Sequence, residues 1–426
     1  MKEYPFRVYT ILIMTILIFT GCPSSPPHST SSGDIVLQGF SKTGNIVGNL
    51  VMASGDRLYI GWSGLNSGDF LTGTSANVYV SAWDGKTLDP LGNVVGTIPR
   101  YSAAPVGNVP LISIGMYDRE PIIAMADASG DVIVKLWDKS TWNTIGDLKL
   151  ADISDTVTAL SSITTTSNRL YLAYGERLTT GSTIINVVAY DGSTWRSLPA
   201  PAIIPDGSFL ISLDMAEMTV NPVIVWMTGN DGTGKLTIPV SEWDGTQWTS
   251  LSDNMKVYSS PWLMTMGAPS CSITDTPNGI AVMWNEGKPI TDPSMGLSYI
   301  PTGIVSTYDG TQWKQLDDEV NNDYPGIATD DRDAEQLRGL WINNKLYVTF
   351  TEMAQVFLAY YSGSGFSDRG NTLNAHPWLS GGYMAYAPYL VQWNGDLYLS
   401  FVEYAMDQNT GAVSSNPVIR EVLVSP

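Results

Sequence analysis

The chain has 426 residues, with 22 Lys and Arg against 41 Asp and Glu, which gives a formal net charge of -19 at pH 7. Charged residues make up only 15% of it, whereas Gly (40), Tyr (21) and Trp (14) are abundant, and this favours a turn-rich β protein over a helical bundle or a disordered chain. The phosphate backbone would repel so acidic a chain, which excludes general nucleic-acid binding.

The N-terminal segment has the pattern of a signal peptide. Lys2 and Arg7 flank its start, and the apolar run 8–20 suits a signal-peptide core but is short for a membrane span. The segment 19–22 (FTGC) resembles the lipobox of bacterial lipoproteins, with Phe where Leu is usual. The resemblance implies cleavage before Cys22, lipidation of that cysteine and firm anchoring in a membrane. The alternative is an ordinary secreted protein in which this cysteine occurs by chance.

We therefore expect three segments: a lipoprotein signal peptide at 1–21, a flexible tether at 22–33 and a folded domain at 34–426. The tether is rich in Ser and Pro and cannot build a core. Cys271 is then the one thiol besides the lipidated cysteine, so no intrachain disulfide is expected. The sequence predicts that Cys271 is a small buried hydrophobe.

A repeated motif decides the fold. An aromatic residue, Asp-Gly and, after two more residues, Trp recurs with variations from residues 83, 137, 190, 243, 308 and 361, so that copies are 53 or 54 residues apart with one interval of 65. Asp-Gly between β-prone runs predicts a type I′ hairpin, in which both central residues have positive φ. The two aromatics of each copy are expected to pack across the strand pair, which makes them structural.

A second motif, an apolar heptad, precedes each hairpin and also occurs in the last unit. Its seven copies are 58–64, 121–127, 170–176, 222–228, 280–286, 346–352 and 397–403. Most copies follow a turn signal and a further short apolar run. Each unit thus holds four antiparallel strands in about 53 residues, which predicts a propeller blade.

This order of strands and turns resembles the kelch repeat and the central domain of galactose oxidase, over about residues 48–425. The chain lacks the diglycine of kelch repeats after the second strand. The resemblance implies an all-β, seven-bladed β-propeller of four-stranded antiparallel blades. It does not extend to copper chemistry, which needs two His, because His376 alone lies in the predicted domain.

The last unit has no hairpin and so lacks its outer strand. Asp34–Phe40 (DIVLQGF) is the strand-like run that no unit uses. We expect this N-terminal strand to complete the last blade and close the ring, because an open sheet edge invites aggregation.

Tight turns and long connections are expected on opposite faces of the propeller. Antiparallel order puts the first-to-second and third-to-fourth turns on one face, and the second-to-third loops with the links between blades on the other. The long segments 65–76, 287–303, 317–335 and 404–416 all belong to the second group. Long connections often carry function, so this loop face is the predicted binding face.

The heptads end at the loop face with a recurring pair of residue types. Five end on a carboxylate, and an aromatic residue often stands two positions earlier, on the same side of the strand. The candidate ligand-binding residues are Asp127, Glu176, Glu286, Glu352, Glu403, Trp62, Trp226 and Trp284. Acids over aromatic surface suit sugars or cationic groups. The alternative is that the aromatics fill the core between blades while the acids cap backbone amides.

Two functions remain open. The first is a non-catalytic binding or scaffold module for a protein or glycan partner, since no H-E-x-x-H, G-x-S-x-G or P-loop motif occurs. The second is a glycan hydrolase that uses two of the loop-face glutamates as acid and base. We expect no cofactor and no metal site, although the acidic segment 317–335 is rich in calcium-type ligands. We expect a monomer in the bacterial cell envelope, at the outer membrane if the cell is Gram-negative.

Overall fold

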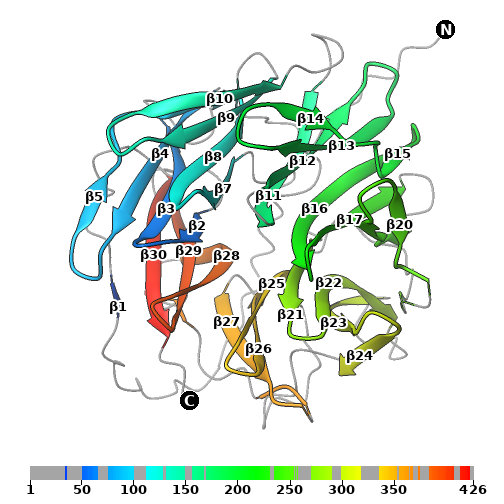
Figure 1. Cartoon of the computed structure of the whole chain (residues 1–426). Helices are drawn as coiled ribbons and strands as arrows, with labels where there is room; N and C mark the ends of the chain where they lie inside the picture. The colour runs from blue at the N-terminus through cyan, green and yellow to red at the C-terminus, as the bar shows by residue number, and fades with distance from the viewer. Residues whose placement is uncertain are drawn as a thin grey trace, which may run out of the picture. The chain divides into compact units, whose positions relative to one another are not determined.

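The described part of the chain is an all-β, seven-bladed β-propeller (Figure 1), as the repeats predict. In this computed structural model the described residues are 34–35, 50–65, 75–99, 112–127, 131–148, 156–166, 169–230, 235–253, 255, 257, 270–289, 299–317, 335–352, 355–363, 365–367, 373–374, 383–406 and 413–422. The chain divides into two compact units, Met1–Ser32 and Gly33–Pro426, and all described residues belong to the second.

Each blade is one antiparallel sheet that follows the chain from its innermost strand outward. Blade 1 contains β2 (Val51–Ser54), β3 (Leu58–Leu65), β4 (Ser75–Trp83) and β5 (Leu88–Pro90). Blade 2 contains β7 (Ile112–Tyr117), β8 (Glu120–Ala126), β9 (Val132–Trp137) and β10 (Trp142–Leu148). Blade 3 contains β11 (Thr156–Thr166), β12 (Arg169–Arg177), β13 (Thr183–Tyr190) and β14 (Trp195–Ser197).

The remaining blades repeat this order with local differences. Blade 4 contains β16 (Ser208–Met218), β17 (Asn221–Asn230), β19 (Val240–Trp243) and β20 (Trp248–Ser250). Blade 5 contains β21 (Cys271–Thr276), β22 (Gly279–Pro289), β23 (Tyr299–Tyr308) and β24 (Trp313–Asp317). Blade 6 contains β25 (Glu335–Ile342), β26 (Lys345–Glu352) and β27 (Gln355–Tyr361). Blade 7 contains β28 (Tyr383–Trp393), β29 (Asp396–Met406), β30 (Val413–Val422) and β1 (Asp34–Ile35).

The seven innermost strands form a closed cycle. Each contacts the innermost strand of the next blade, and β28 contacts β2. The N-terminal strand closes the ring as predicted, because β1 pairs antiparallel with β30 through Asp34 opposite Arg420 and Ile35 opposite Ile419. The rest of the predicted closing segment, 36–40, lies outside the described residues.

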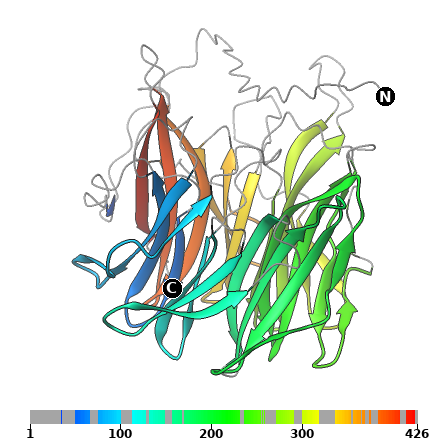
Figure 2. The same cartoon turned by 90° about the horizontal axis from the view of Figure 1, so that it is seen from above.

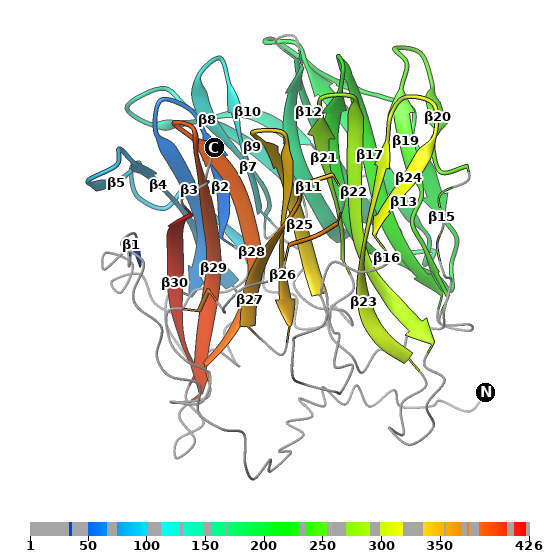
Figure 3. The same ribbon diagram turned by 90° about the horizontal axis from the view of Figure 1, so that it is seen from below.

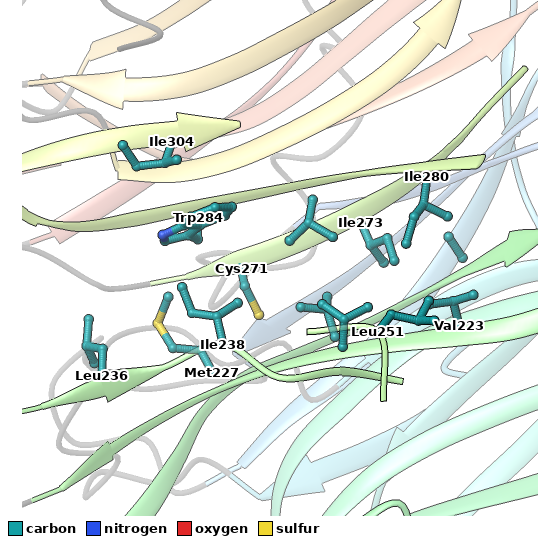
Figure 4. Close-up of a cluster of buried hydrophobic side chains, with 14 of the residues drawn as sticks. Val223, Met227, Leu236, Ile238, Leu251, Cys271, Ile273, Ile280, Trp284 and Ile304 are labelled. Carbon is teal, nitrogen blue, oxygen red and sulfur yellow. The ribbon is translucent and has the colours of Figure 1, made fainter. Parts of the chain in front are cut away.

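The core lies between neighbouring blades because both faces of each sheet are covered. The seven second strands, which coincide with the predicted heptads, therefore carry nearly continuous buried apolar runs. Figure 4 shows one such layer, where Cys271 and Trp284 of blade 5 face Met227, Leu236 and Ile238 of blade 4. Cys271 is buried, as predicted, and burial raises the pKa of its thiol to about 12.

The Asp-Gly hairpins are real, but the predicted type I′ turn is wrong. The two aromatics of the motif pair directly, as in Tyr190 opposite Trp195, so the loop between them has four residues and not two. Of Asp191 and Gly192, the glycine alone has positive φ, at 97°. The Asp191 carboxylate instead accepts the backbone N–H groups of the third and fourth loop residues at 3.0 and 2.9 Å. This side-chain cap stabilises the longer loop and explains the aspartate.

Type I′ geometry is found in the first-to-second turns of blades 2, 6 and 7. Both loop residues have positive φ in Asn343-Asn344 (50° and 61°) and in Asn394-Gly395 (53° and 92°), and the flanking strands pair immediately on either side. Asparagine tolerates the left-handed region because its short amide can bond locally. These turns and the Asp-Gly loops lie at the same end of the blades, whose strands run side by side between two faces (Figures 2 and 3).

Several elements differ from the predicted four-strand unit. Three short extra strands, β6 (Gly96–Pro99), β15 (Ala202–Ile204) and β18 (Leu236–Thr237), pair with β4, β13 and β17. In blade 6 the expected outer strand is reduced, among the described residues, to a bridge between Tyr361 and Phe366. The predicted long segment 404–416 is partly wrong, because β29 and β30 extend into it and pair as far as Met406 opposite Val413.

The tryptophans of the Asp-Gly motif join neighbouring blades. The indole N–H of Trp142 donates to Leu91 O at 2.8 Å, that of Trp195 to Ile145 O at 2.8 Å and that of Trp248 to Pro199 O at 2.7 Å. Trp313 donates to Leu251 O in the same way. In each case the acceptor belongs to the outermost segment of the preceding blade. We call these four bonds the outer stitches.

Removal of one outer stitch should destabilise the fold. Replacement of Trp195 by benzothienylalanine keeps the ring shape but removes the N–H donor. We expect the free energy of unfolding, measured in urea, to fall by about 1 kcal/mol, since one hydrogen bond is lost and the Ile145 carbonyl must find water. The same replacement at Trp83 is the matched control, because its buried indole N–H has no hydrogen-bond partner in the described part of the chain. Equal losses at both positions would contradict the role of the stitch.

Candidate functional site

The five predicted carboxylates stand at the loop-face ends of the second strands of blades 2, 3, 5, 6 and 7. Four of them are buried, with exposed fractions of 6% or less: Glu176, Glu286, Glu352 and Glu403. Asp127 alone among the five is partly exposed. A dissolved partner can therefore reach Asp127 directly, whereas the glutamates lie beneath the surface.

Asp127 closes the second-to-third loop of blade 2. Its Oδ1 accepts the backbone N–H of Asp131 at 3.1 Å, and its own N–H donates to Asp131 O at 2.8 Å. This is the amide-capping role that the sequence leaves open as an alternative. The cap also holds the carboxylate at a fixed place on the loop face.

Two of the buried glutamates bond within their own blade. Glu176 Oε2 accepts from Asn186 Nδ2 at 2.6 Å, and Glu286 Oε1 accepts from Trp284 Nε1 at 3.0 Å. Burial, with a smaller contribution from the neighbouring Glu176 charge, raises the pKa of Tyr174 to about 12. The side chains of Glu176 and Tyr174 are therefore neighbours in a buried, water-poor part of blade 3.

The three candidate tryptophans lie in the core between blades. Trp62, Trp226 and Trp284 have exposed fractions of 4%, 5% and 0% and belong to three different hydrophobic clusters. Trp62 stacks on Tyr79 with ring centroids 5.6 Å apart. The structure thus places these rings where they stabilise blade packing.

A polar group near the centre of the ring was not anticipated from the sequence. The innermost strand of every blade is a sheet edge, and its N–H and C=O groups need partners. In blades 5, 6 and 7, side chains of the preceding blade bond some of these groups. Asp214 Oδ2 accepts from Ile273 N at 3.1 Å, and Ser272 Oγ donates to Leu337 O at 2.8 Å. Ser212 Oγ likewise accepts from Cys271 N at 3.2 Å and donates to Cys271 O at 3.1 Å.

Arg338 connects this group across blade 5. Its Nη1 donates to Asp214 Oδ2 at 2.8 Å, and its guanidinium lies 5.9 Å from the ring centroid of Tyr389. The exposed fractions of the Arg338 and Asp214 side chains are 22% and 6%. Blades 4, 6 and 7 thus meet through three side chains. A sequence signal was present, since Arg338 is the sole basic residue in the seven innermost strands.

Two strained residues lie beside Arg338 and Tyr389. Gln336 and Ala387 occupy equivalent bulges, in which two residues oppose one on the second strand, and both have positive φ, at 53° and 56°. A left-handed non-glycine residue costs on the order of 1 kcal/mol, and such strain is often retained at functional places. The Ala387 N–H donates to Gln336 Oε1 at 2.6 Å, so one bulge holds the other.

No group of three or more His, Cys, Asp or Glu side chains within the described ranges is placed to hold a metal ion. Among these residues no helix is long and apolar enough to cross a membrane. Much of the predicted binding face, including 318–334, lies outside the described residues. Cys22, the predicted lipid anchor, also lies outside them.

No family model matches the sequence, and no curated protein matches it. The fold is similar to that of a mutant Aleuria aurantia lectin in complex with Fucα1-6GlcNAc, with TM-score 0.44 and 13% identity over 78% of this chain and 99% of that one. It is also similar to a Penicillium chrysogenum α-L-arabinanase complexed with arabinobiose, with TM-score 0.46 and 12% identity over 73% and 92%. At such TM-scores and identities, neither ligand nor site residues transfer to this chain.

The strain at the bulges predicts the direction in which a glycine substitution changes the free energy of unfolding. Ala387→Gly should leave the free energy of unfolding unchanged or raise it, because glycine adopts positive φ without steric cost. Ala385→Gly, at a buried position of the same strand, should lower it by about 1 kcal/mol through lost packing and backbone entropy. Urea unfolding of both variants provides the comparison. A larger loss from Ala387→Gly than from Ala385→Gly would show that Ala387 is not strained.

Proposed function

We propose that the chain is a non-catalytic binding module that holds a protein or glycan partner on its loop face. The observation that carries this proposal is the recurrence of carboxylates at one structural position of the loop face, where Asp127 is partly exposed. On the turn face the aspartates cap their own loops; hydrogen bonds from the Thr311 hydroxyl and from backbone N–H groups lower the pKa of Asp309 to about 2.

The positions and hydrogen bonds of the carboxylates favour binding over hydrolysis. A glycosidase needs an acid and a base that flank one cleft about 5 to 9.5 Å apart. Here each acid stands in a different blade, and Glu176 and Glu286 are engaged by donors of their own sheets. Carboxylates held by these hydrogen bonds stabilise the loop-face rim.

The proposed contact is made by Asp127, and the buried residues support it. The carboxylate of Asp127 is partly exposed and held by its loop, so it can accept hydrogen bonds from sugar hydroxyls or from cationic groups of a partner. The buried acids and the candidate tryptophans fix the strand ends that carry the loop face. The excess of acidic residues also favours partners with basic or neutral surfaces.

A binding screen with matched variants tests this proposal. The full chain is applied to a glycan array and used to capture envelope proteins. Any partner found should bind the Asp127→Asn variant about tenfold more weakly, the cost of weakening one charge-assisted hydrogen bond. Asp244→Asn is the control, since Asp244 is an exposed carboxylate on the turn face.

Two results would count against a loop-face binder. One is weaker binding by the Asp244→Asn variant with no effect of Asp127→Asn. The other is release of sugar from arrayed glycans that is abolished by Glu176→Gln or Glu286→Gln, which would establish hydrolysis.

We also propose that Cys22 carries a lipid and anchors the chain in the bacterial cell envelope, at the outer membrane if the cell is Gram-negative. The support is the signal-like segment and its lipobox resemblance. Cys22→Ser should move the chain from the membrane fraction to the soluble fraction and abolish incorporation of labelled palmitate. Unchanged membrane association and labelling in the variant would exclude this anchor.

A further inference from the structure

The seven seams between blades are not held in the same way. Outer stitches cross the seams between blades 1 and 2, 2 and 3, 3 and 4, and 4 and 5. Blade 6 has Phe366 and blade 1 has Leu88 at the position of the stitching tryptophan, and neither side chain has an N–H group. Blade 7 has no Asp-Gly hairpin. The three seams between blades 5 and 6, 6 and 7, and 7 and 1 therefore have no outer stitch, because the sequence provides no tryptophan at that position.

In the described part of the chain, polar links at the inner edge cross three consecutive seams, from blade 4 to blade 7. Ser212 and Asp214 join blade 4 to blade 5, Ser272 joins blade 5 to blade 6, and Gln336 joins blade 6 to blade 7. All four side chains reach from one blade to the innermost strand of the next, so the links run in one direction. Among the described residues, the seam between blades 4 and 5 has both kinds of bond.

Arg338 ties these links together. Its ion pair with Asp214 spans from blade 6 to blade 4, and its guanidinium lies over Tyr389 of blade 7. The Asp214 carboxylate also accepts from Ile273 N of blade 5. Arg338 and its partner Asp214 thus connect four consecutive blades, 4 to 7, and blades 6 and 7 lie beyond the last outer stitch.

We propose that Asp214, Gln336, Arg338 and Tyr389 form an inner clasp, a conformational device that holds blades 5, 6 and 7 in the ring and whose release opens this sector before the others. The strain at Gln336 and Ala387 fits this role. Each bulge is held against its backbone preference by the bond between them, so loss of the clasp favours rearrangement there.

The ion pair acts through specificity as much as through stability. A buried pair is often replaceable by apolar side chains, yet loss of one partner leaves the other charge uncompensated in a desolvated place. Arg338 and Asp214 lie two blades apart, so their contact depends on the positions of all blades between them. Opening of the seam between blades 4 and 5 or between blades 5 and 6 must break it.

Hydrogen exchange on the full chain tests the clasp. In the Arg338→Met variant we expect backbone amides of β25, β26, β28 and β29 to exchange at least about tenfold faster, while those of β3, β8 and β12 change less than about twofold. Arg57→Met is the matched control. It removes the same side chain from an exposed ion pair with Asp89 in blade 1, with an N–O distance of 3.1 Å, and should leave blades 5 to 7 unchanged.

A double-mutant cycle separates the clasp from independent contributions. Asp214→Asn and Arg338→Met together should accelerate exchange in blades 6 and 7 by much less than the product of the two single effects. If Arg338→Met does not fold, Arg338→Lys, which keeps the charge but loses the planar fork, should give the same pattern at smaller amplitude. Uniform acceleration in all seven blades, or single effects that multiply, would overturn the proposal.

Discussion

The structure depends on how the two edges of each sheet find hydrogen-bond partners. A blade ends inward and outward in a strand whose N–H and C=O groups have no further strand to bond. In this propeller, side chains of neighbouring blades bond the outer edge at four seams and the inner edge at three. Indole N–H groups reach backward to outer carbonyls, as Trp195 does to Ile145, and short polar side chains reach forward to inner strands, as Ser272 does to Leu337. The same hydrogen bonds thus supply partners to the backbone groups of the edge strands and attach each blade to its neighbour.

Much of the fold was predictable because its units are local and periodic. The spacing of the Asp-Gly motif, the seven apolar heptads and the unassigned run after the tether were sufficient to predict seven blades and an N-terminal closing strand. Each of these features rests on residues close together in the sequence. A period of about 53 residues also makes each copy confirm the others.

The inner edge could not be predicted in the same way. Asp214 and Arg338 are 124 residues apart and meet only after the ring has closed. The bulges at Gln336 and Ala387 insert one extra residue opposite Phe350 and Phe401, and no local pattern distinguishes them from regular strand. The Asp-Gly loops were predicted with the wrong turn because the aspartate cap, a side-chain interaction, outweighs the usual preference for two-residue hairpins.

Burial changes the meaning of the predicted site. Strand alternation correctly groups the aromatic and acidic positions on one side of each second strand, but it cannot tell a surface from a space between packed sheets. Trp284 and Glu286 bond to each other inside blade 5, with exposed fractions of 0% and 1%. The repeated positions that these residues occupy are thus buried positions of the blades, and Asp127 is the carboxylate among the five that is partly exposed.

Closure of the ring by the N-terminal strand is the central claim, and a disulfide across that seam tests it most directly. Ile35→Cys and Ile419→Cys, combined with Cys22→Ser, place two thiols at directly paired positions of β1 and β30, where strand pairing brings Cα atoms to disulfide distance. Oxidation should form an intramolecular disulfide as readily as the control pair Leu136→Cys and Asn143→Cys, which is paired within blade 2. Formation of the control disulfide with no link between positions 35 and 419 would contradict the closed ring.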